Sequence, residues 1–288
     1  FQMLGNKDTT VPLFEDIFKN WAREGVETIV EPWSGAFILP LHSTKRAIKA
    51  GLKNFDANIY DKEKYIIIKS IQEGRFGEVR KSIDKALRMI TNEIRKEAQG
   101  SKRLNNVINK FFQKYPDNWI GSKRWLSFVR GPKLAGSEIG KDVLVFEEVH
   151  KEISQIFQKS FRNLVNRKFN DIESSVLNAV LKRIGKHAAA TQPFLGGFKS
   201  GIGFNEIEGK IFDKYGMIHG LEDANNLFKY SKKHGTKINL FSEDSVQFVK
   251  RYKGFNPDKI GFFMDPPYVN EWPNYLKEVP KSQEEALK

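Results

Sequence analysis

Residues 259–268 read Lys-Ile-Gly-Phe-Phe-Met-Asp-Pro-Pro-Tyr, and this stretch decides the fold of the chain around it. The apolar run at residues 260–264 predicts a short buried strand. That strand must end at Pro266 and Pro267, because prolines have no backbone N–H to donate to a sheet. Residues 265–268 therefore follow the carboxyl end of a strand, where open α/β sheets bind their ligands.

The same four residues bring together groups of one chemical kind. The carbonyl oxygens of Pro266 and Pro267 and the carboxylate of Asp265 accept hydrogen bonds, and Tyr268 adds an aromatic ring. Acceptors beside a stacking ring suit a planar group that carries an exocyclic amine, such as N6 of adenine. The other interpretation is a strand-ending turn whose tyrosine is buried in the core.

Upstream, short strands alternate with helices. Apolar residues at helical spacing, among them Leu13, Phe18 and Trp21, predict a helix over residues 11–24. The elements expected after it are a strand at 28–30, a helix over 41–50, a strand at 54–55 that ends on Asp56, a helix over 60–72 and, far downstream, a strand at 237–241. This alternation is typical of a parallel, doubly wound α/β sheet.

The charge is concentrated in the middle of the chain. The net charge is +13, and residues 71–200 contain 25 Lys and Arg against 13 Asp and Glu. We therefore expect a basic, mostly helical insert at residues 75–190, inside a more neutral domain made of residues 1–74 and 191–288. The helices expected in the insert cover residues 78–98, 102–115, 143–166 and 172–190.

A polyanion is the commonest partner of such a basic segment, and a solvated helical surface is the alternative. Cations bind phosphates, and interleaved aromatic rings can stack on exposed bases or belong to the core of the insert. The cations expected to contact nucleic acid are Lys102, Arg103, Lys123, Arg124, Arg130, Lys133 and Lys199.

Composition excludes several kinds of site. The 288 residues contain no cysteine, so a disulfide scaffold, a Cys-ligated zinc site and a thiol nucleophile are excluded. The five histidines lack metal-binding spacing, and we expect no metal. No apolar stretch approaches the roughly 18 residues of a membrane span, and the first ten residues lack the features of a secretory signal.

The tetrapeptide at residues 265–268 resembles the (D/N)PP(Y/F) motif of S-adenosylmethionine-dependent amino methyltransferases. Weaker motifs, in the same order, resemble those of the Dam-type DNA adenine-N6 methyltransferases of phages and bacteria. They are Leu-Gly-Asn-Lys at 4–7, the strand and glycine turn at 29–37, Asp-Ala-Asn at 56–58, the glycine-rich segment at 194–205 and the acidic segment at 241–244. The resemblance covers about residues 1–75 and 190–288.

This resemblance implies a Rossmann-like methyltransferase sheet with a site for S-adenosylmethionine. It implies an enzyme that acts on a flipped adenine in double-stranded DNA. It also implies a protein of the cytoplasm, in a bacterium or a phage-infected cell. The family pattern gives the catalytic role to Asp265, Pro266, Pro267 and Tyr268. It gives cofactor binding to Lys7, Glu31, Pro32, Trp33, Gly35, Asp56 and Asp244. Asp56 would accept from the ribose hydroxyls, Asp244 from the adenine amine, and Lys7 would pair with the methionine carboxylate.

The chain departs from the family pattern in two places. Phe37 stands where the family has the second glycine of its first motif, and 20 residues follow Tyr268, where the family has several more strands. We therefore expect a sheet that is incomplete at its C-terminal end or is completed by a second chain. Two other functions stay open: a nucleic-acid-binding protein with a degenerate methyltransferase domain, and an RNA adenine methyltransferase. The biological role also stays open.

Overall fold

The chain divides into two units, one made of residues Phe1–Val79 and Ile218–Lys288 and the other of Arg80–Met217. These boundaries lie at 79/80 and 217/218, whereas the charge pattern places them at 74/75 and 190/191. The structure, a computed structural model, describes residues 11–34, 42–114, 169–184 and 214–264, together with 156, 159, 160, 162–164 and 167.

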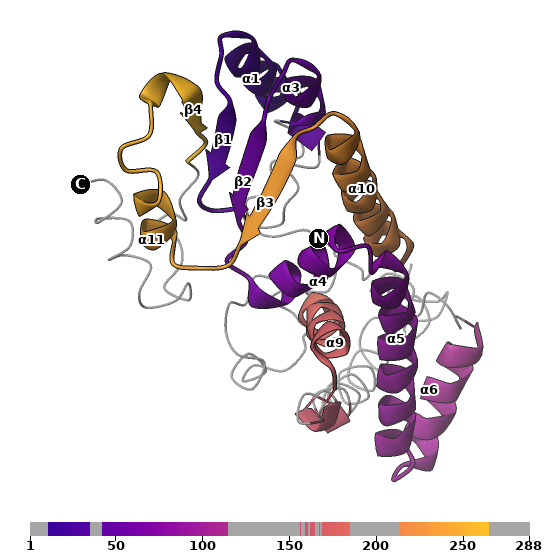
Figure 1. Ribbon diagram of the computed structural model, residues 1–288. Helices are drawn as coiled ribbons and strands as arrows, with labels where there is room; N and C mark the ends of the chain where they lie inside the picture. The colour runs from indigo at the N-terminus through magenta and orange to yellow at the C-terminus, as the bar shows by residue number, and fades with distance from the viewer. Residues whose placement is uncertain are drawn as a thin grey trace, which may run out of the picture. The chain divides into compact units, whose positions relative to one another are not determined.

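A four-stranded sheet forms the centre of the first unit (Figure 1). Its strands are β1 (Thr28–Glu31), β2 (Asn54–Asn58), β3 (Lys237–Phe241) and β4 (Ile260–Phe262), in the order β3-β2-β1-β4. Every pair is parallel, and Val30, Asp56 and Asn239 lie side by side in register. The prediction of an α/β fold with a parallel sheet is confirmed.

The helices of the first unit are α1 (Val11–Arg23), α3 (Lys45–Lys49), α4 (Lys62–Gln72), α10 (Lys214–Lys233) and α11 (Ser245–Lys250), with a 3₁₀ turn, η3 (Pro257–Lys259). α10 begins just inside the second unit. The sequence predicts the first three helices but neither α10 nor α11. α10 contains two glycines, which weaken a helical pattern, and α11 has only six residues.

One face of the sheet packs against α1. Phe18 is fully buried, and its ring lies 6.3 Å from that of Phe55 on β2 and 5.8 Å from that of Phe263. Trp21, one turn further along α1, lies directly over Gly261 of β4. Leu13, which the sequence groups with these residues, instead remains 61% exposed.

Gly261 leaves the space that Trp21 occupies. A Cβ at this position would lie 2.7 Å from Trp21 Cζ3, which is too close for any side chain. We expect Gly261→Ala to lower the free energy of unfolding by about 2 kcal/mol, because an overpacked core must shift. Urea denaturation measures the change.

Gly220→Ala on α10 is the matched control, because among the described residues nothing outside the helix's own backbone lies within 4 Å of a Cβ there. It should raise the free energy of unfolding by about 0.5–1 kcal/mol through helix propensity. Adding Trp21→Leu to Gly261→Ala should restore part of the loss. Equal stability of Gly261→Ala and the wild type would contradict the packing of Trp21 on this glycine.

The opposite face of the sheet packs against α11 and the turn that follows it. The ring of Phe248 lies 5.0 Å from that of Phe241 on β3, and the ring of Tyr252 lies 5.6 Å from that of Phe262 on β4. This face also carries polar residues, since Asn54, Asp56 and Asn58 alternate along β2. Polar side chains are unusual in a parallel sheet, whose strands are usually apolar on both faces.

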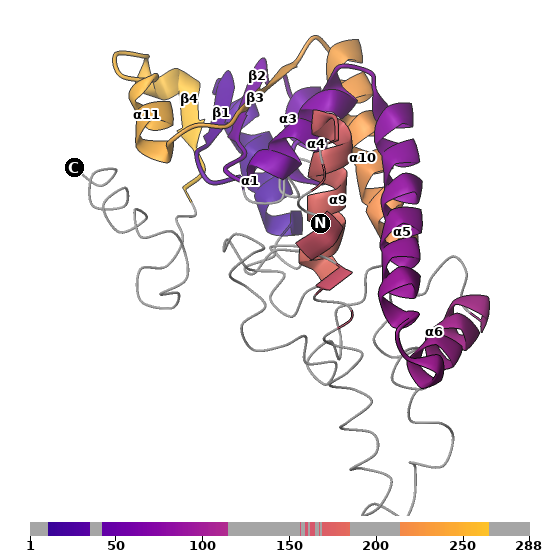
Figure 2. The same ribbon diagram turned by 90° about the horizontal axis from the view of Figure 1, so that it is seen from below.

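The second unit is helical where it is described. Its helices are α5 (Phe76–Ala98), α6 (Lys102–Lys114) and α9 (Asp171–Ile184), and α5 begins at the end of the first unit. The views in Figures 1 and 2 show α5 as one long helix with α6 turning back from its end. Among all the described helices, none combines the length and the apolar composition that crossing a membrane requires.

Candidate functional site

The strand order reverses at β1. The chain passes from β1 to β2 and then outward to β3, and it returns to place β4 on the other side of β1. The segments that leave β1 and β4 therefore start side by side, and the N–H of Phe263 still donates to the carbonyl of Val30 at 2.9 Å. In α/β sheets the crevice at such a reversal, outside the carboxyl ends of the strands, is where ligands bind.

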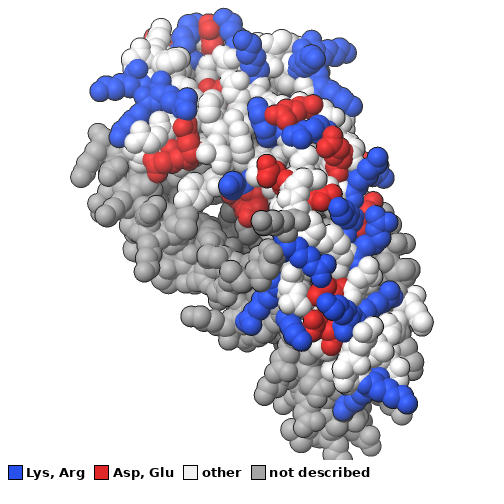
Figure 3. Space-filling model, turned by 60° about the horizontal axis from the view of Figure 1, so that its bottom comes forward, with Lys and Arg blue, Asp and Glu red and all other residues white. Residues whose placement is uncertain are grey.

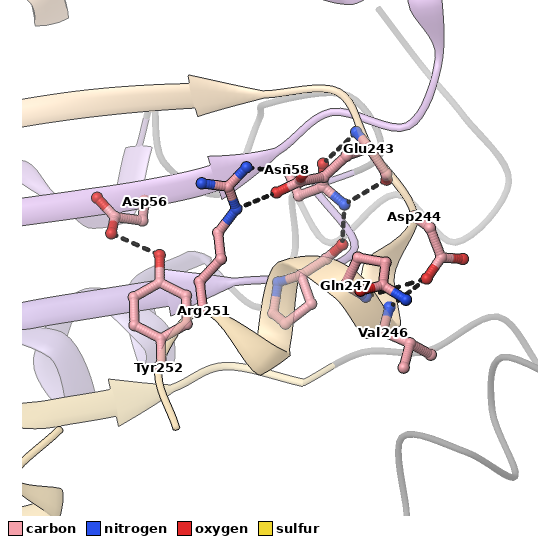
Figure 4. A network of polar contacts seen from close by, with 9 residues as sticks. Asp56, Asn58, Glu243, Asp244, Val246, Gln247, Arg251 and Tyr252 are labelled. Carbon is pink, nitrogen blue, oxygen red and sulfur yellow. Dashed lines mark hydrogen bonds and ion pairs between the residues drawn. The ribbon is translucent and has the colours of Figure 1, made fainter. Parts of the chain in front are cut away.

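Asn58, the last residue of β2, ties three strand ends together (Figure 4). Its side-chain N–H groups donate to the carbonyls of Pro32, at 3.1 Å, and Glu243, at 3.0 Å, while its side-chain oxygen accepts from the N–H of Glu243 at 3.0 Å. Its own carbonyl accepts from the N–H of Ser34. Asn58 is fully buried, so these bonds fix the segments after β1 and β3 without help from water.

Asp56 lies in the middle of β2, because the strand continues to Asn58 rather than ending at Asp56 as the sequence predicts. Its carboxylate is 8% exposed and already accepts two hydrogen bonds. One comes from Asn239 Nδ2 on β3, at 2.7 Å. The other comes from the hydroxyl of Tyr252, at 2.6 Å (Figure 4). The carboxylate is therefore held in one orientation by two neighbouring elements.

Tyr252, in the turn that follows α11, is the second partner of this carboxylate. Burial raises the pKa of Tyr252 well above its ordinary value, and the hydrogen bond to Asp56 raises it further. The hydroxyl consequently stays protonated and keeps its role as a donor at any physiological pH. Each carboxylate oxygen can accept a second hydrogen bond, so Asp56 retains capacity for a ligand.

Asp244 follows β3 and caps α11. Its Oδ1 accepts from the N–H groups of Val246 and Gln247, each at 3.0 Å, and the residue is exposed. Beside it, Glu243 forms a bidentate ion pair with Arg251, at 2.5 and 2.8 Å, and this pair raises the pKa of Arg251. The capping bonds fix the Asp244 carboxylate at the carboxyl edge of the sheet.

Ser34 adds a buried hydroxyl at the end of β1. The residue is 1% exposed, and its Oγ has no hydrogen-bond partner among the described residues. A buried hydroxyl without a partner is costly, so it is a candidate to bond a ligand. The neighbouring Pro32 carbonyl is well bonded by comparison, since it accepts from Asn58 and, at 3.2 Å, from Ser245 Oγ.

The other predicted cofactor residues differ in their exposure. Glu31 is buried at the end of β1, Pro32 is buried and Trp33 is half-buried. The structure thus brings Glu31, Pro32, Trp33, Asp56 and Asp244 to one region of the sheet, at or near its carboxyl edge. Lys7, Gly35 and the motif Asp265, Pro266, Pro267 and Tyr268 lie outside the described residues.

Of the predicted nucleic-acid contacts, only Lys102 and Arg103 are described. Both are exposed in the first turn of α6. The remaining five, Lys123, Arg124, Arg130, Lys133 and Lys199, lie outside the described residues.

Sequence reasoning assigned no role to Asn58, Asn239, Ser34 or Tyr252. A signal for Asn58 was present, because it lies two positions after Asp56 and strand alternation then places both on one face. Asn239 and Tyr252 gave no comparable signal, since they lie 183 and 196 residues from Asp56.

Within the described ranges, no three His, Asp or Glu side chains gather as the ligands of a metal ion would. What the site offers is a set of fixed acceptors and a buried hydroxyl at a strand-order reversal. No protein-family model matches this chain, and comparison with curated proteins and with solved structures gives no significant match.

Proposed function

We propose that the protein is an S-adenosylmethionine-dependent DNA methyltransferase that modifies N6 of adenine. The observation that carries the proposal is the position of β4, the strand that precedes the Asp-Pro-Pro-Tyr motif in the sequence. Asp265 follows the end of β4 by three residues, and β4 lies beside β1 where the strand order reverses. The order β3-β2-β1-β4 is also that of one half of a Rossmann sheet extended by the first strand of the other half.

The carboxyl edge of the sheet supports binding of S-adenosylmethionine. In this proposal Glu31, Pro32, Trp33 and Gly35 form the turn that approaches the cofactor, and Lys7 pairs with its carboxylate. Asp244 accepts from the adenine amine through Oδ2, for which no described residue supplies a donor. Asp56 accepts from the ribose hydroxyls through its remaining lone pairs, and Tyr252 fixes its orientation.

The chemistry needs positioning more than it needs a reactive side chain. The cofactor supplies a methyl group on a positively charged sulfur. Asp265 and the carbonyl of Pro266 accept from the target amine, so the nitrogen lone pair can point toward that methyl carbon. Tyr268 stacks on the base, and Pro267 keeps the elbow rigid. The N–C bond would form as the C–S bond breaks, S-adenosylhomocysteine would leave as a neutral thioether, and the proton lost by the amine would pass to solvent.

Double-stranded DNA is the proposed substrate because the insert is basic and the motif order is that of DNA enzymes. An adenine inside a duplex must be flipped out before its amine can reach such a site. A second chain that completes the sheet beside β4, one of the two edge strands among those described, belongs to the same proposal. So does action in the cytoplasm of a bacterium or a phage-infected cell.

A second candidate is a nucleic-acid-binding protein whose methyltransferase domain no longer binds the cofactor. The observation that favours it is the state of Asp56, whose two oxygens already accept from Asn239 and Tyr252. If those two hydrogen bonds leave no room for ribose hydroxyls, the domain keeps the fold but does not bind the cofactor.

One pair of measurements separates the candidates. We expect calorimetry to detect binding of S-adenosylmethionine, and we expect labelled methyl groups to enter adenine of duplex DNA. Salt-dependent DNA binding without any cofactor binding would reject the enzyme and support the second candidate. Methyl incorporation into RNA, with none into duplex or single-stranded DNA, would support the same methyl transfer but with RNA as the substrate.

A further inference from the structure

The long helix α5 separates its side chains by burial. Val79, Ile83, Ile90 and Ile94, on one side of the helix, are fully buried. The opposite side carries Lys81, Lys85, Arg88, Asn92 and Arg95, which we call the basic row. At about 100° per residue these five positions fall within about 80° of one another, and they span about 21 Å of the helix.

In the C-terminal half of α5, charges are also separated by sign. The acidic residues Glu93 and Glu97 turn toward the interior of the unit, where they are 4% and 10% exposed. Asn163 donates to both carboxylates, at 3.0 and 2.9 Å. Arg167 pairs with Glu93, and Lys159 pairs with Glu97 at 2.6 Å. The acids of this half are therefore neutralised inside the unit. In the other half Glu78 and Asp84 flank the basic row, which still carries more cations than the acids beside it.

The cations of the basic row are only partly compensated. Lys85, at one margin, pairs with Glu173 of α9 at 2.7 Å. Lys81 and Arg88 are exposed, and no described residue forms an ion pair or hydrogen bond with either. Arg46, by contrast, pairs with Glu15 and Asp16. Figure 3 shows cations and acids interspersed over the face that it draws.

We propose that the basic row docks on the phosphate backbone of duplex DNA. A straight row about 21 Å long matches about six base pairs at 3.4 Å each, and a duplex presents phosphates along that whole length. Asn92, between the cations, has an amide that can donate to a phosphate oxygen. The choice of DNA among polyanions rests on the proposed function, whereas the positive face is a property of α5 alone.

The test removes two charges without weakening the helix. Lys81→Gln with Arg88→Gln keeps the side-chain length and the helix propensity. Binding to a labelled duplex of mixed sequence is followed by fluorescence anisotropy over a range of salt. At about 0.1 M salt we expect the dissociation constant to rise roughly 10- to 60-fold, and the slope of log K against log salt to fall by about 1.8.

Lys232→Gln with Lys233→Gln is the matched control, because both are exposed lysines in the last turn of α10 and carry the same total charge. It should leave the salt slope unchanged. An unaltered slope in the α5 variant, or an equal loss in the control, would overturn the proposal. So would a loss of binding to vesicles of anionic lipid with DNA binding intact.

Calorimetry with S-adenosylmethionine on the α5 variant keeps the two proposals apart. Loss of DNA binding with cofactor binding intact supports docking by α5 within an enzyme. Loss of DNA binding by a protein that never binds the cofactor supports the docking and rejects the methyltransferase.

Discussion

Replacing Asp265 with alanine is expected to lower the rate of methyl transfer to adenine on the order of a hundred- to a thousandfold, with little change in cofactor affinity. Asp265 follows the end of β4 by three residues in sequence, and β4 lies beside β1 where the strand order reverses. Removing one positioned hydrogen-bonding group from a reacting centre costs about that factor. Transfer of labelled methyl groups under single-turnover conditions measures it.

Asp258→Ala is the control for this change. Asp258 is an exposed acid in η3, and it lies seven residues upstream of Asp265 in the same segment. The control should retain the wild-type rate. Tyr268→Ala should also lower the rate, because the target base loses its stacking partner. Wild-type rates in both Asp265→Ala and Tyr268→Ala would remove the basis for the proposed chemistry.

Replacing Asn58 with alanine is expected to lower the free energy of unfolding by about 3 kcal/mol. The change removes the three side-chain hydrogen bonds that join β2 to Pro32 and Glu243. The N–H and carbonyl of Glu243 lose their partner, while Pro32 keeps only the bond from Ser245. Chemical denaturation, followed by circular dichroism, measures the loss.

Asn54→Ala provides the matched control on the same strand. Asn54 is half-buried and makes one side-chain bond, to Thr28 Oγ1 at 3.2 Å, so its loss should cost no more than about 1 kcal/mol. Asn58→Asp should be at least as damaging as alanine, because a carboxylate would face the carbonyls of Pro32 and Glu243. A stable Asn58→Asp variant would show that the strand ends are not held in this way.

The sequence predicts the parallel sheet because the fold rests on local signals. Apolar runs at β1, β3 and β4 and helical spacing in α1, α4 and α5 are each readable within about ten to twenty residues. The end of β2 is different. The sequence predicts that this strand stops at Asp56, because an acid is a poor strand residue, yet pairing on both sides extends it to Asn58.

The polar contacts of the site were less predictable. Asp244 follows β3, and the structure gives it a defined place as the cap of α11. The contacts of Asp56 depend on side chains from β3 and from the turn after α11, which only the tertiary fold brings near. Sequence periodicity carries no information about such distant pairs. It also does not predict that the hydroxyl of Ser34 is buried, because that burial depends on the tertiary fold.

The interruption of the sheet has a consequence for synthesis on the ribosome. The first two strands emerge early, but the partner of Asp56 on β3 lies 183 residues later. At about 5–20 residues per second, the ribosome takes roughly 9–37 s to add the residues between β2 and β3. Until then the nascent β1–β2 pair has no neighbouring strand. During that time both of its edges are open to pairing with other chains. Overproduction of this protein should therefore benefit from slow, cool expression or from chaperones that shield strand edges.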